Sequence, residues 1–579
     1  MESVVGVDHK ISRVIWSYGD QKQDFYQYIS IFLLFLSFSG LALDLPCDTM
    51  EELKRKRDFM KARNDYNRAL RTHERKFAII WKSLVVGLAV GIITVLYRLT
   101  LTQAEHWSKS IYGYFSANMN LVLPMFAGLA LVGWLIGMLV TRYPLISGSG
   151  IPQVEGQILG YFKNPWLSTL VAKFLGGAVT LLAGLSVGRE GPCIQLGAST
   201  AQGISNTLSK TRTERKILIA SGASAGLSAA FNAPLAGVMF ALEEVYRYFS
   251  PVILLATIIS AVAADLVASY IFGLNPIFNF VVNDKIPLEN YWLILVLGII
   301  IGVSGAFYNY ILVSTIKLYR KTLDYNKYIK FVIPFLVAGV LGLYFPIVLG
   351  GGEHIIEVLS LSNGLRWLVL VLGVKFIFSM ISFGSGAPGG IFFPLLVIGS
   401  LVGAVYGSVA INSMGVDPDL FYNFVVLAMA GFFTAIVRAP ITGIILIIEM
   451  TGSFSSLLPL TVVSIIAYIT ADMLRSTPIY ESLLAIQVGE GVSERKDTDQ
   501  YKKITFESIV HHGCRFEGKT IKDLALPYGS LVVAIRRHGG DITPNGETVI
   551  HAEDTLVVLT SLKDEVRVKE ILKDCTEAE

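Results

Sequence analysis

Long apolar segments recur along most of the chain and predict a bundle of membrane helices. They are uneven in length, and glycine and proline interrupt many of them. A spanning helix needs about 20 apolar residues, so several segments are too short to cross fully. Broken helices are tolerated at membrane depth only where they line a cavity or lie within protein, which favours a transporter or channel. The segments lie near residues 77–100, 120–140, 168–187, 216–230, 234–248, 251–273, 291–314, 330–350, 366–383, 391–411, 421–436, 440–451 and 458–474.

Residues 1–76 precede this membrane body and divide into two parts. The run at 29–43 is apolar for about 15 residues, short of the 20 or so that a spanning helix needs. It is open to three interpretations: a signal-type segment, a membrane-surface helix, or upstream sequence included by a wrong start codon. We favour an appendage without a transport role. Residues 51–76 form a basic helical stretch directly before the first spanning segment, which places this stretch in the cytoplasm.

The pattern changes again after the membrane body, which we assign to residues 77–487. Residues 488–503 are polar and charged and predict a linker. Residues 504–579 predict a small α/β domain with a turn at Gly539-Gly540. Within it we expect strands at 531–536 and 554–560 and helices at 520–526 and 563–573.

Composition supports a polytopic α-helical membrane protein rather than a soluble enzyme. The 579 residues are 53% hydrophobic and 16% charged, with a mean hydropathy of +0.57, whereas soluble domains carry about 25% charged residues. A net charge of +3 gives no support for a nucleic-acid partner. The four cysteines lack metal-ligand spacing, so we expect structural thiols, no metal and no cofactor.

Two adjacent charges interrupt one apolar segment, within Gly188-Arg189-Glu190-Gly191-Pro192. Each costs about 2.5–3.5 kcal/mol at membrane depth, so such charges mark function by default. The glycines permit a tight backbone, and Pro192 suits the first turn of a helix. A helix beginning here would present free N–H groups and a positive dipole end, which together bind anions. Glu190 is then a candidate built-in anion, and Arg189 a supporting residue.

Two further Gly/Pro segments could open helices toward the same point. N–H and hydroxyl donors without a full positive charge suit a halide, which must bind and still be released. Ser149 supplies one hydroxyl. Tyr480 supplies another, although by residue type alone it would be an interfacial anchor. The segments are Gly148-Ser149-Gly150-Ile151-Pro152 and Gly389-Gly390-Ile391-Phe392-Phe393-Pro394.

An internal repeat relates the two halves of the membrane body. The stretch from Ala225 to Glu243 resembles that from Ala430 to Glu449, with one extra residue before the second Ala-Pro. Pro192 in the first half likewise parallels Pro394 in the second. Related halves with interrupted helices point to a midplane binding site between inverted repeats.

These motifs resemble those of the CLC chloride channel and chloride/proton antiporter family. GSGIP (148–152), GREGP (188–192) and GGIFFP (389–394) occur in order, and FNAPLAG (231–237) and VRAPITGIILIIEMT (437–451) also match. The C-terminal region, with LVVAIRRHGG and AEDTLVVL, resembles a TrkA-C (RCK C-terminal) regulatory domain rather than paired CBS domains. The resemblance implies a CLC-type inverted-repeat fold with broken and tilted helices, followed by a small cytoplasmic α/β domain.

The resemblance also implies roles for individual residues. Ser149 and Tyr480 would coordinate a central chloride through their hydroxyls, assisted by the amides of Ile391 and Phe392. Glu190 would be the external gating glutamate, which occupies an anion site when deprotonated and carries a proton outward when protonated. Serine rather than proline at position 149 points to chloride rather than nitrate.

Glu244 decides between the two activities of the family. Antiporters of this family carry an internal proton-transfer glutamate at this position, whereas channels of the family usually carry an apolar residue. Glu243 and Glu449 occupy matching positions in the two repeats and are interpreted as structural. Glu244 aligns with Met450 in the second repeat, so it breaks the symmetry and is singled out for function. Gln153 stands where some bacterial relatives carry glutamate, which puts an accessory acidic group in doubt.

We therefore predict a chloride/proton antiporter, with a passive voltage- or pH-gated chloride channel of the same fold as the alternative. A membrane-anchored sensor is disfavoured by the three converging anion motifs. An intramembrane enzyme is disfavoured because no catalytic set occurs among the membrane segments. We expect a homodimer in a bacterial plasma membrane, in contact with lipid, with the C-terminal domain in the cytoplasm. Whether that domain binds a small nucleotide is left open at this point.

Overall fold

The computed structural model describes two stretches of the chain, residues 52–489 and 503–572. Between residues 52 and 76 only the backbone helix is described. The apolar run at 29–43 lies outside the described residues, and its interpretation stays a prediction. The gaps are at 210, 248, 275, 277, 279–285, 324–327, 512–513, 538–539, 562–563, 565–566 and 569–570.

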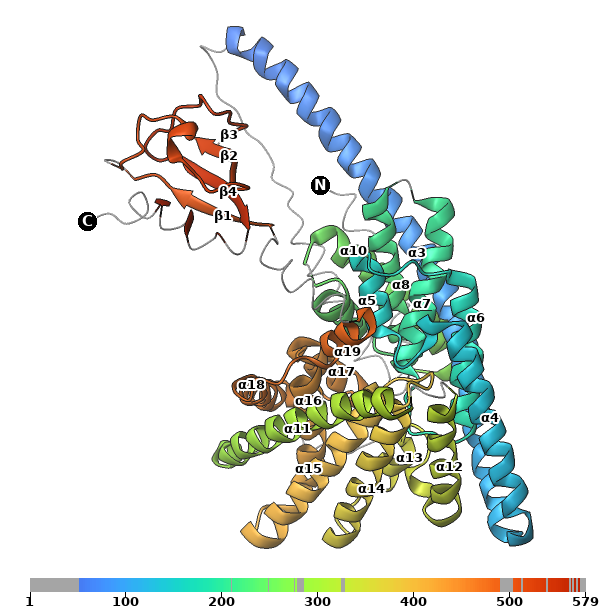
Figure 1. Ribbon diagram of the computed structural model, residues 1–579. Coiled ribbons are helices and arrows are strands. Elements are labelled where there is room, and N and C mark those ends of the chain that lie inside the picture. Colours follow the sequence, from blue (N-terminus) through green and yellow to red (C-terminus); the bar gives the residue numbers. More distant parts are fainter. Residues whose placement is uncertain are drawn as a thin grey trace, which may run out of the picture. The chain divides into compact units, whose positions relative to one another are not determined.

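Helices make up the first stretch (Figure 1). They follow the predicted apolar segments, and α3 continues from the basic stretch through the first spanning segment. By length and composition, 8 helices among the described residues can cross a membrane. The helices are α3 (Glu52–Ala117), α4 (Val122–Arg142), α5 (Ile151–Leu159), α6 (Trp166–Leu182), α7 (Glu190–Leu208), α8 (Arg212–Phe231), α9 (Pro234–Phe240), α10 (Pro251–Phe272), α11 (Tyr291–Leu323), α12 (Ile329–Tyr344), α13 (Glu353–Val358), α14 (Leu365–Gly384), α15 (Phe392–Met414), α16 (Phe421–Val437), α17 (Pro440–Thr451), α18 (Leu457–Met473) and α19 (Ile479–Val488).

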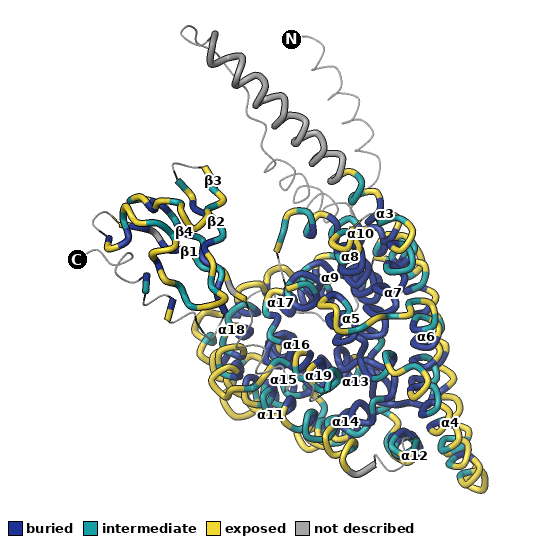
Figure 2. The backbone as a smooth tube through the Cα atoms, turned by 45° about the horizontal axis from the view of Figure 1, so that its top comes forward, coloured by how far each residue is buried: buried dark blue, intermediate teal, exposed yellow. Residues whose placement is uncertain are grey.

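Burial separates central helices from peripheral ones (Figure 2). In the span that contains α16, 94% of the apolar window is buried, compared with 22% in the span that contains α4. The outer helix α11 exposes apolar side chains such as Leu295, Ile299 and Val303. A helix that is apolar on its outer face as well as its inner face is typical of a membrane span, where lipid replaces water.

Both halves of the membrane body contain the same joint between two helices. Helix α8 ends at Asn232 with φ 50°, and α16 ends at Arg438 with φ 71°. A left-handed residue is a common way to end a helix. The following helices begin at Pro234 in α9 and Pro440 in α17, where the missing N–H is not needed. The internal repeat predicted from the sequence is confirmed in these segments.

Each half also caps a helix of the other half. The Glu243 carboxylate accepts hydrogen bonds from the amide and the hydroxyl of Thr442, both at 2.8 Å, at the start of α17. The Glu449 carboxylate accepts from the amides of Leu235 at 3.0 Å and Ala236 at 2.8 Å, at the start of α9. First-turn amides lack partners within their own helix, and a negative charge there is favourable. These contacts support the structural interpretation of both glutamates.

The second stretch forms a four-stranded antiparallel sheet of order β1-β4-β2-β3. Strand β4 lies between β1 and β2, so that Val558 pairs with Phe506 on one side and Val532 on the other. Val558 and Leu556 are fully buried in the core of this domain. The strands are β1 (Lys503–Ile509), β2 (Leu531–Arg537), β3 (Gly540–Ile542) and β4 (Thr555–Ser561).

The sequence located the strands of this domain better than its helices. The predicted strands at 531–536 and 554–560 match β2 and β4 within one residue. The helix predicted at 520–526 is wrong, because Ile521–Leu524 is a single 3-10 turn that Ala525 ends with φ 44°. Gly540, predicted in a turn, begins β3. Of the predicted final helix, helical residues are described at 567–568 and 571–572.

Two cysteines among the described residues differ in state. Cys193 is a buried free thiol, as predicted. Cys514 is disulfide-bonded, so the prediction of a free thiol is wrong there. Spacing along the chain does not reveal such a bond, because folding rather than sequence distance brings two cysteines together.

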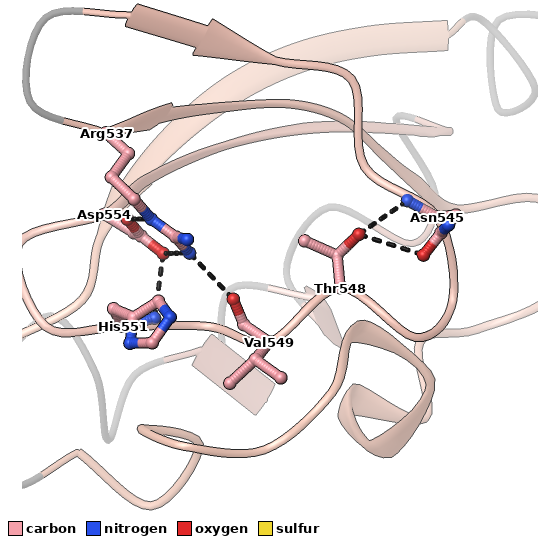
Figure 3. Close-up of polar contacts among 6 residues, drawn as sticks. All are labelled: Arg537, Asn545, Thr548, Val549, His551 and Asp554. Carbon is pink, nitrogen blue, oxygen red and sulfur yellow. Dashed lines mark hydrogen bonds and ion pairs between the residues drawn. The ribbon is translucent and has the colours of Figure 1, made fainter.

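A partly buried ion pair connects the last residue of β2 to the residue before β4 (Figure 3). Asp554 is fully buried, and its carboxylate accepts from Arg537 Nε at 2.8 Å and Nη2 at 2.7 Å, and from the His551 amide at 2.8 Å. Arg537 Nη2 also donates to the Val549 carbonyl at 2.7 Å. Burial raises the pKa of Asp554, but the hydrogen bonds from Arg537 and His551 outweigh burial and hold this pKa below its usual value. Bidentate charge-assisted pairs of this kind are strong.

We expect Asp554→Asn to destabilise this domain by about 1–3 kcal/mol at neutral pH, because it leaves Arg537 partly buried and unpaired. Amide hydrogen exchange in β2 and β4 of the full-length protein should speed up by about 5- to 100-fold. Because the folded pKa of Asp554 is depressed, the wild-type advantage should be complete above the unfolded pKa of about 3.9 and disappear as pH falls through the folded value.

The matched control is Asp541→Asn on β3, whose side chain is 74% exposed beside Arg536. Exposed ion pairs contribute little, so this variant should exchange at the wild-type rate. Equal exchange rates in the two variants would show that the Arg537–Asp554 pair does not stabilise the sheet.

Candidate functional site

Backbone hydrogen bonds join the three Gly/Pro loops that the sequence singled out. Gly188 and Gly390 each donate their amide to the other's carbonyl at 2.7 Å, forming an antiparallel bridge. The Gly389 amide donates to the Gly148 carbonyl at 3.0 Å, and the Gly148 amide donates to the Gly386 carbonyl at 3.1 Å. The predicted convergence of these loops is therefore observed in the backbone.

Glycine is required where the loops approach most closely. A Cβ atom on Gly191 would overlap the Ser149 hydroxyl, and one on Gly390 would lie 3.1 Å from the Gly191 amide nitrogen. Gly150 has φ 99°, a left-handed value that favours glycine, directly before α5. These positions explain why the motifs are rich in glycine.

Three helices begin at the joined loops, and a fourth, α19, packs against α5. Helix α5 starts at Ile151 with Pro152 at its second residue, α7 at Glu190, α15 at Phe392 and α19 at Ile479. Pro394 and Pro192 lie in the first turns of α15 and α7. First-turn amides, including that of Phe392, have no partner within their own helix, and the N-terminal end of the dipole is positive.

Two side chains of these loops and one of α19 carry buried oxygens. Ser149 is 1% exposed, and Glu190 and Tyr480 are fully buried. Among the described residues, the Ser149 and Tyr480 hydroxyls and both Glu190 carboxylate oxygens have no hydrogen-bond partner. A buried polar group without a partner costs about 1–3 kcal/mol, and more when it is charged. Burial also excludes the interfacial-anchor interpretation of Tyr480.

Aromatic packing fixes Tyr480 beside the start of α15. The Phe392 ring lies 6.0 Å from Phe240 and 4.8 Å from Phe433, and Phe240 lies 6.3 Å from Tyr480 in an edge-to-face arrangement. Edge-to-face aromatic pairs at these separations are favourable. Helices α9, α15, α16 and α19 are thereby held around one apolar wall.

Arg189 forms an ion pair that the sequence did not predict. Its Nη2 lies 2.7 Å from Glu353 Oε1, whereas its Nε lies 3.7 Å from Glu190 Oε1. The shorter contact of Arg189 is therefore with Glu353 and not with the buried carboxylate of Glu190. The expected supporting role of Arg189 therefore has a specific partner at the start of α13.

Sequence reasoning missed a buried lysine beneath the first loop. Lys173 of α6 is fully buried, and its Nζ donates to the carbonyls of Ile146 at 2.9 Å and Gly148 at 2.6 Å. A lone lysine inside an apolar segment was the available signal, because such charges are costly at membrane depth. These bonds hold the loop that carries Ser149 against α6.

Glu244 lies in a second cluster, at the end of α9. It is 4% exposed within a short π-helix, Ala241–Val245. Arg247 has φ 54° and places its Nη2 3.1 Å from Glu244 Oε1 and its Nη1 3.3 Å from Glu155 Oε1. Glu155 is buried on α5, and the Arg247 side chain is 39% exposed. Sequence reasoning did not identify Glu155 or Arg247. Glu155 is supplied by a separate helix, α5, whereas Arg247 follows Glu244 by three residues, a spacing that was the available signal.

The neighbouring Gln153 has a structural contact. Its Nε2 donates to the Ser147 carbonyl at 2.6 Å, and the residue is 4% exposed. The amide at this position therefore helps to hold the loop before α5. Glu155, two residues further on, supplies an acidic group on the same helix.

The arrangement is suited to an anion. Helix starts and hydroxyls provide donors, and the full positive charge of Arg189, beside Glu190 in the chain, is engaged by Glu353. Groups of three or more His, Cys, Asp or Glu that could hold a metal ion are absent from the described residues.

Comparison with protein families gives two matches. A family model described as voltage gated chloride channel matches residues 128–472, more than half of the chain. A second model, the TrkA-C domain, matches residues 506–573.

Individual relatives agree with these matches. The chain is 36% identical over 438 residues to the H(+)/Cl(−) exchange transporter ClcA of Vibrio cholerae serotype O1, covering 72% of this chain and 91% of that protein. It is similar to the crystal structure of a slow cyanobacterial Cl−/H+ antiporter, with a TM-score of 0.66 and 30% identity, covering 71% of this chain and 98% of that one. A eukaryotic CLC transporter shares the fold at 21% identity and a TM-score of 0.59, covering 78% and 79% of the two chains. This chain is a multi-pass integral membrane protein of the voltage-gated chloride channel (CLC) family, with a TrkA-C domain after its membrane body.

Proposed function

We propose that this protein exchanges chloride for protons across the membrane, with chloride coordinated by Ser149 and Tyr480 and by the amides of Ile391 and Phe392. The observation that carries the proposal is the set of buried Ser149, Glu190 and Tyr480 oxygens without hydrogen-bond partners among the described residues. Hydroxyl and amide donors without a full charge among them favour an anion that is bound and then released. The names of the similar exchangers support the same substrates.

Glu190 is proposed as the external gating glutamate. Its carboxylate is fully buried at the start of α7, where N–H donors favour a negative charge. A carboxylate and a chloride that compete for one set of donors are linked, because protonation of the carboxylate frees the donors for chloride. This competition couples the two ions without a covalent step.

Glu244 is proposed as the internal proton-transfer residue. It is buried, yet Arg247 connects it to a partly exposed surface and to Glu155. Intramembrane carboxylates that contact a partner and approach solvent are typical of proton relays. Glu243, the residue before Glu244, caps α17 and has no part in this proton route.

We expect Glu190→Gln to abolish proton coupling and leave chloride transport that does not respond to pH, because the amide does not titrate. Proton flux in reconstituted vesicles should fall at least about tenfold, to the level of empty vesicles, as expected when an intramembrane relay carboxylate is removed. Glu357→Gln, at a side chain that is 72% exposed, is the control and should behave as wild type. Chloride transport by Glu190→Gln that still follows pH would contradict the gating role.

We expect Glu244→Gln to keep chloride flux within about twofold of wild type and to lose proton movement, because only the internal proton donor is removed. Glu243→Gln makes the same change one residue earlier, and its remaining carbonyl oxygen can still cap α17. This control should keep proton coupling. The assignment fails if Glu244→Gln still drives protons against their gradient when a chloride gradient is imposed.

Reconstituted vesicles that contain the wild-type protein also test the exchange function itself. Under unequal pH, the reversal potential of a passive chloride channel ignores the proton gradient, whereas that of an exchanger follows it. A wild-type reversal potential set by the chloride gradient alone would contradict exchange and support the passive chloride channel.

The proposal also covers the organisation of the chain. We place the transport unit at 77–487, a linker at 488–503 and a regulatory domain at 504–579, with the C-terminal domain in the cytoplasm and two chains per molecule. A small nucleotide is the ligand class proposed for the regulatory domain. Binding to the folded state should raise the unfolding temperature of the full-length protein by an amount that grows with nucleotide concentration. An unfolding temperature unchanged at millimolar nucleotide would remove this part of the proposal.

A further inference from the structure

The second half of the chain contains a loop that copies the backbone of the Ser149 loop. A 3-10 turn, Pro346–Val348, precedes it, just as Pro144–Ile146 precedes the first loop. Gly350 and Gly352 have φ 63° and 100°, compared with 64° and 99° at Gly148 and Gly150. The two loops therefore share one conformation.

The supporting contacts of the two loops are also the same. Lys375 is fully buried and donates to the carbonyls of Val348 at 2.9 Å and Gly350 at 2.8 Å, as Lys173 does in the first half. The Gly350 amide donates to the Gly184 carbonyl at 3.0 Å, which matches the bond from Gly148 to Gly386. The repeat thus preserves the position and the support of this loop.

The chemistry of the second loop is different. Gly351 replaces the hydroxyl of Ser149, and the helix that follows begins with Glu353 where the first loop has Ile151. This loop therefore has no hydroxyl to offer an anion. Instead it presents a carboxylate.

Arg189 links the carboxylate of Glu353 to the carboxylate of Glu190. Arg189 Nη2 lies 2.7 Å from Glu353 Oε1, and Arg189 Nε lies 3.7 Å from Glu190 Oε1. The Arg189 side chain is 13% exposed, and the Glu353 side chain is 35% exposed. A chain of three charges therefore runs from a partly exposed residue to the fully buried Glu190.

We propose that Glu353 is a positioning residue that competes with Glu190 for the Arg189 guanidinium, and thereby sets how tightly Glu190 is held in the anion site. The proposal rests on the gating role proposed for Glu190. With Glu353 in place, Arg189 makes its short contact outward and only a longer one to Glu190. Without Glu353, the guanidinium is free to pair fully with Glu190, because close carboxylate pairing is the strong mode of binding for arginine.

Several other ionisable groups lie around Glu353, Arg189 and Glu190, and the substitution leaves their side chains in place. Helix α3 supplies groups near Glu190 and Arg189, α14 supplies a lysine beneath the loop, and α7 and α19 supply one group each. They are Tyr97, Arg98, Glu105, Cys193, Lys375 and Tyr480.

The test measures chloride exchange in vesicles as a function of external pH for wild type and Glu353→Gln. The substitution keeps the length of the side chain and removes its charge. Tighter pairing should keep Glu190 charged to lower pH, so the midpoint of the profile should move toward acid by about 0.5–1 pH unit. A midpoint that stays in place or moves toward alkaline pH would overturn the proposal.

A matched control and a second variant keep the result decisive. Glu357→Gln removes the same charge from the same helix, at a side chain that contacts His354 rather than Arg189, and should keep the wild-type midpoint. An equal shift in this control would reduce the effect to general surface charge and overturn the proposal. If Glu353→Gln does not fold, Glu353→Ser decides by the same criterion, since serine is well tolerated at a helix start.

The test also separates this inference from the proposed function. Proton coupling of the wild-type protein is measured in the same vesicles. Loss of coupling in wild type would contradict exchange, whereas coupled transport with an unmoved midpoint in Glu353→Gln would contradict only the role of Glu353.

Discussion

The paired hydrogen bonds between Gly188 and Gly390 are the contact on which the rest of the site depends. They join the two halves of the chain at the residues that precede α7 and α15. Because Glu190 and Phe392 follow within two residues, the bridge sets the positions of both helix starts. A Cβ atom on Gly389 would overlap Val187, so the approach is possible only with glycine. One backbone contact therefore determines where a buried carboxylate and a second set of amide donors meet.

Cationic side chains near this contact and in the Glu244 cluster are engaged by protein oxygens. Lys173 is engaged by two carbonyls, Arg189 by Glu353, and Arg247 by Glu155 and Glu244. A bare ammonium or guanidinium in a medium of low dielectric would hold an anion strongly and slow its release. In the proposed anion site, engaging these cations leaves the weaker dipoles of helix starts and hydroxyls to face the anion. The same arrangement satisfies charges that would otherwise be costly to bury.

Much of this could be predicted from the sequence, and the missing parts have a common cause. The apolar segments, the three Gly/Pro loops and the buried position of Glu190 follow from local pattern and from the cost of charge in a membrane. The same rule could have singled out Lys173 and Lys375, which each lie 25 residues from the loop glycine whose carbonyl they bind. Glu353 and Arg247 carry no such mark, because their contacts with Arg189 and Glu155 join elements that are distant in the sequence. In the C-terminal domain, alternating apolar residues predicted β2 and β4, whereas the cap that limits Ile521–Leu524 to one turn depends on the left-handed Ala525.

The reciprocal bonds of Glu243 and Glu449 have a consequence for the origin of such a chain. Each half leaves the first amides of one of its helices without a partner and supplies the carboxylate that satisfies the other half. A half-length polypeptide would carry a carboxylate and an uncapped helix start that do not meet within one copy. Two copies placed in the relationship of the present halves would satisfy both. This is the way in which two identical half-length chains would cap each other, and a duplicated and fused chain would keep the same contacts.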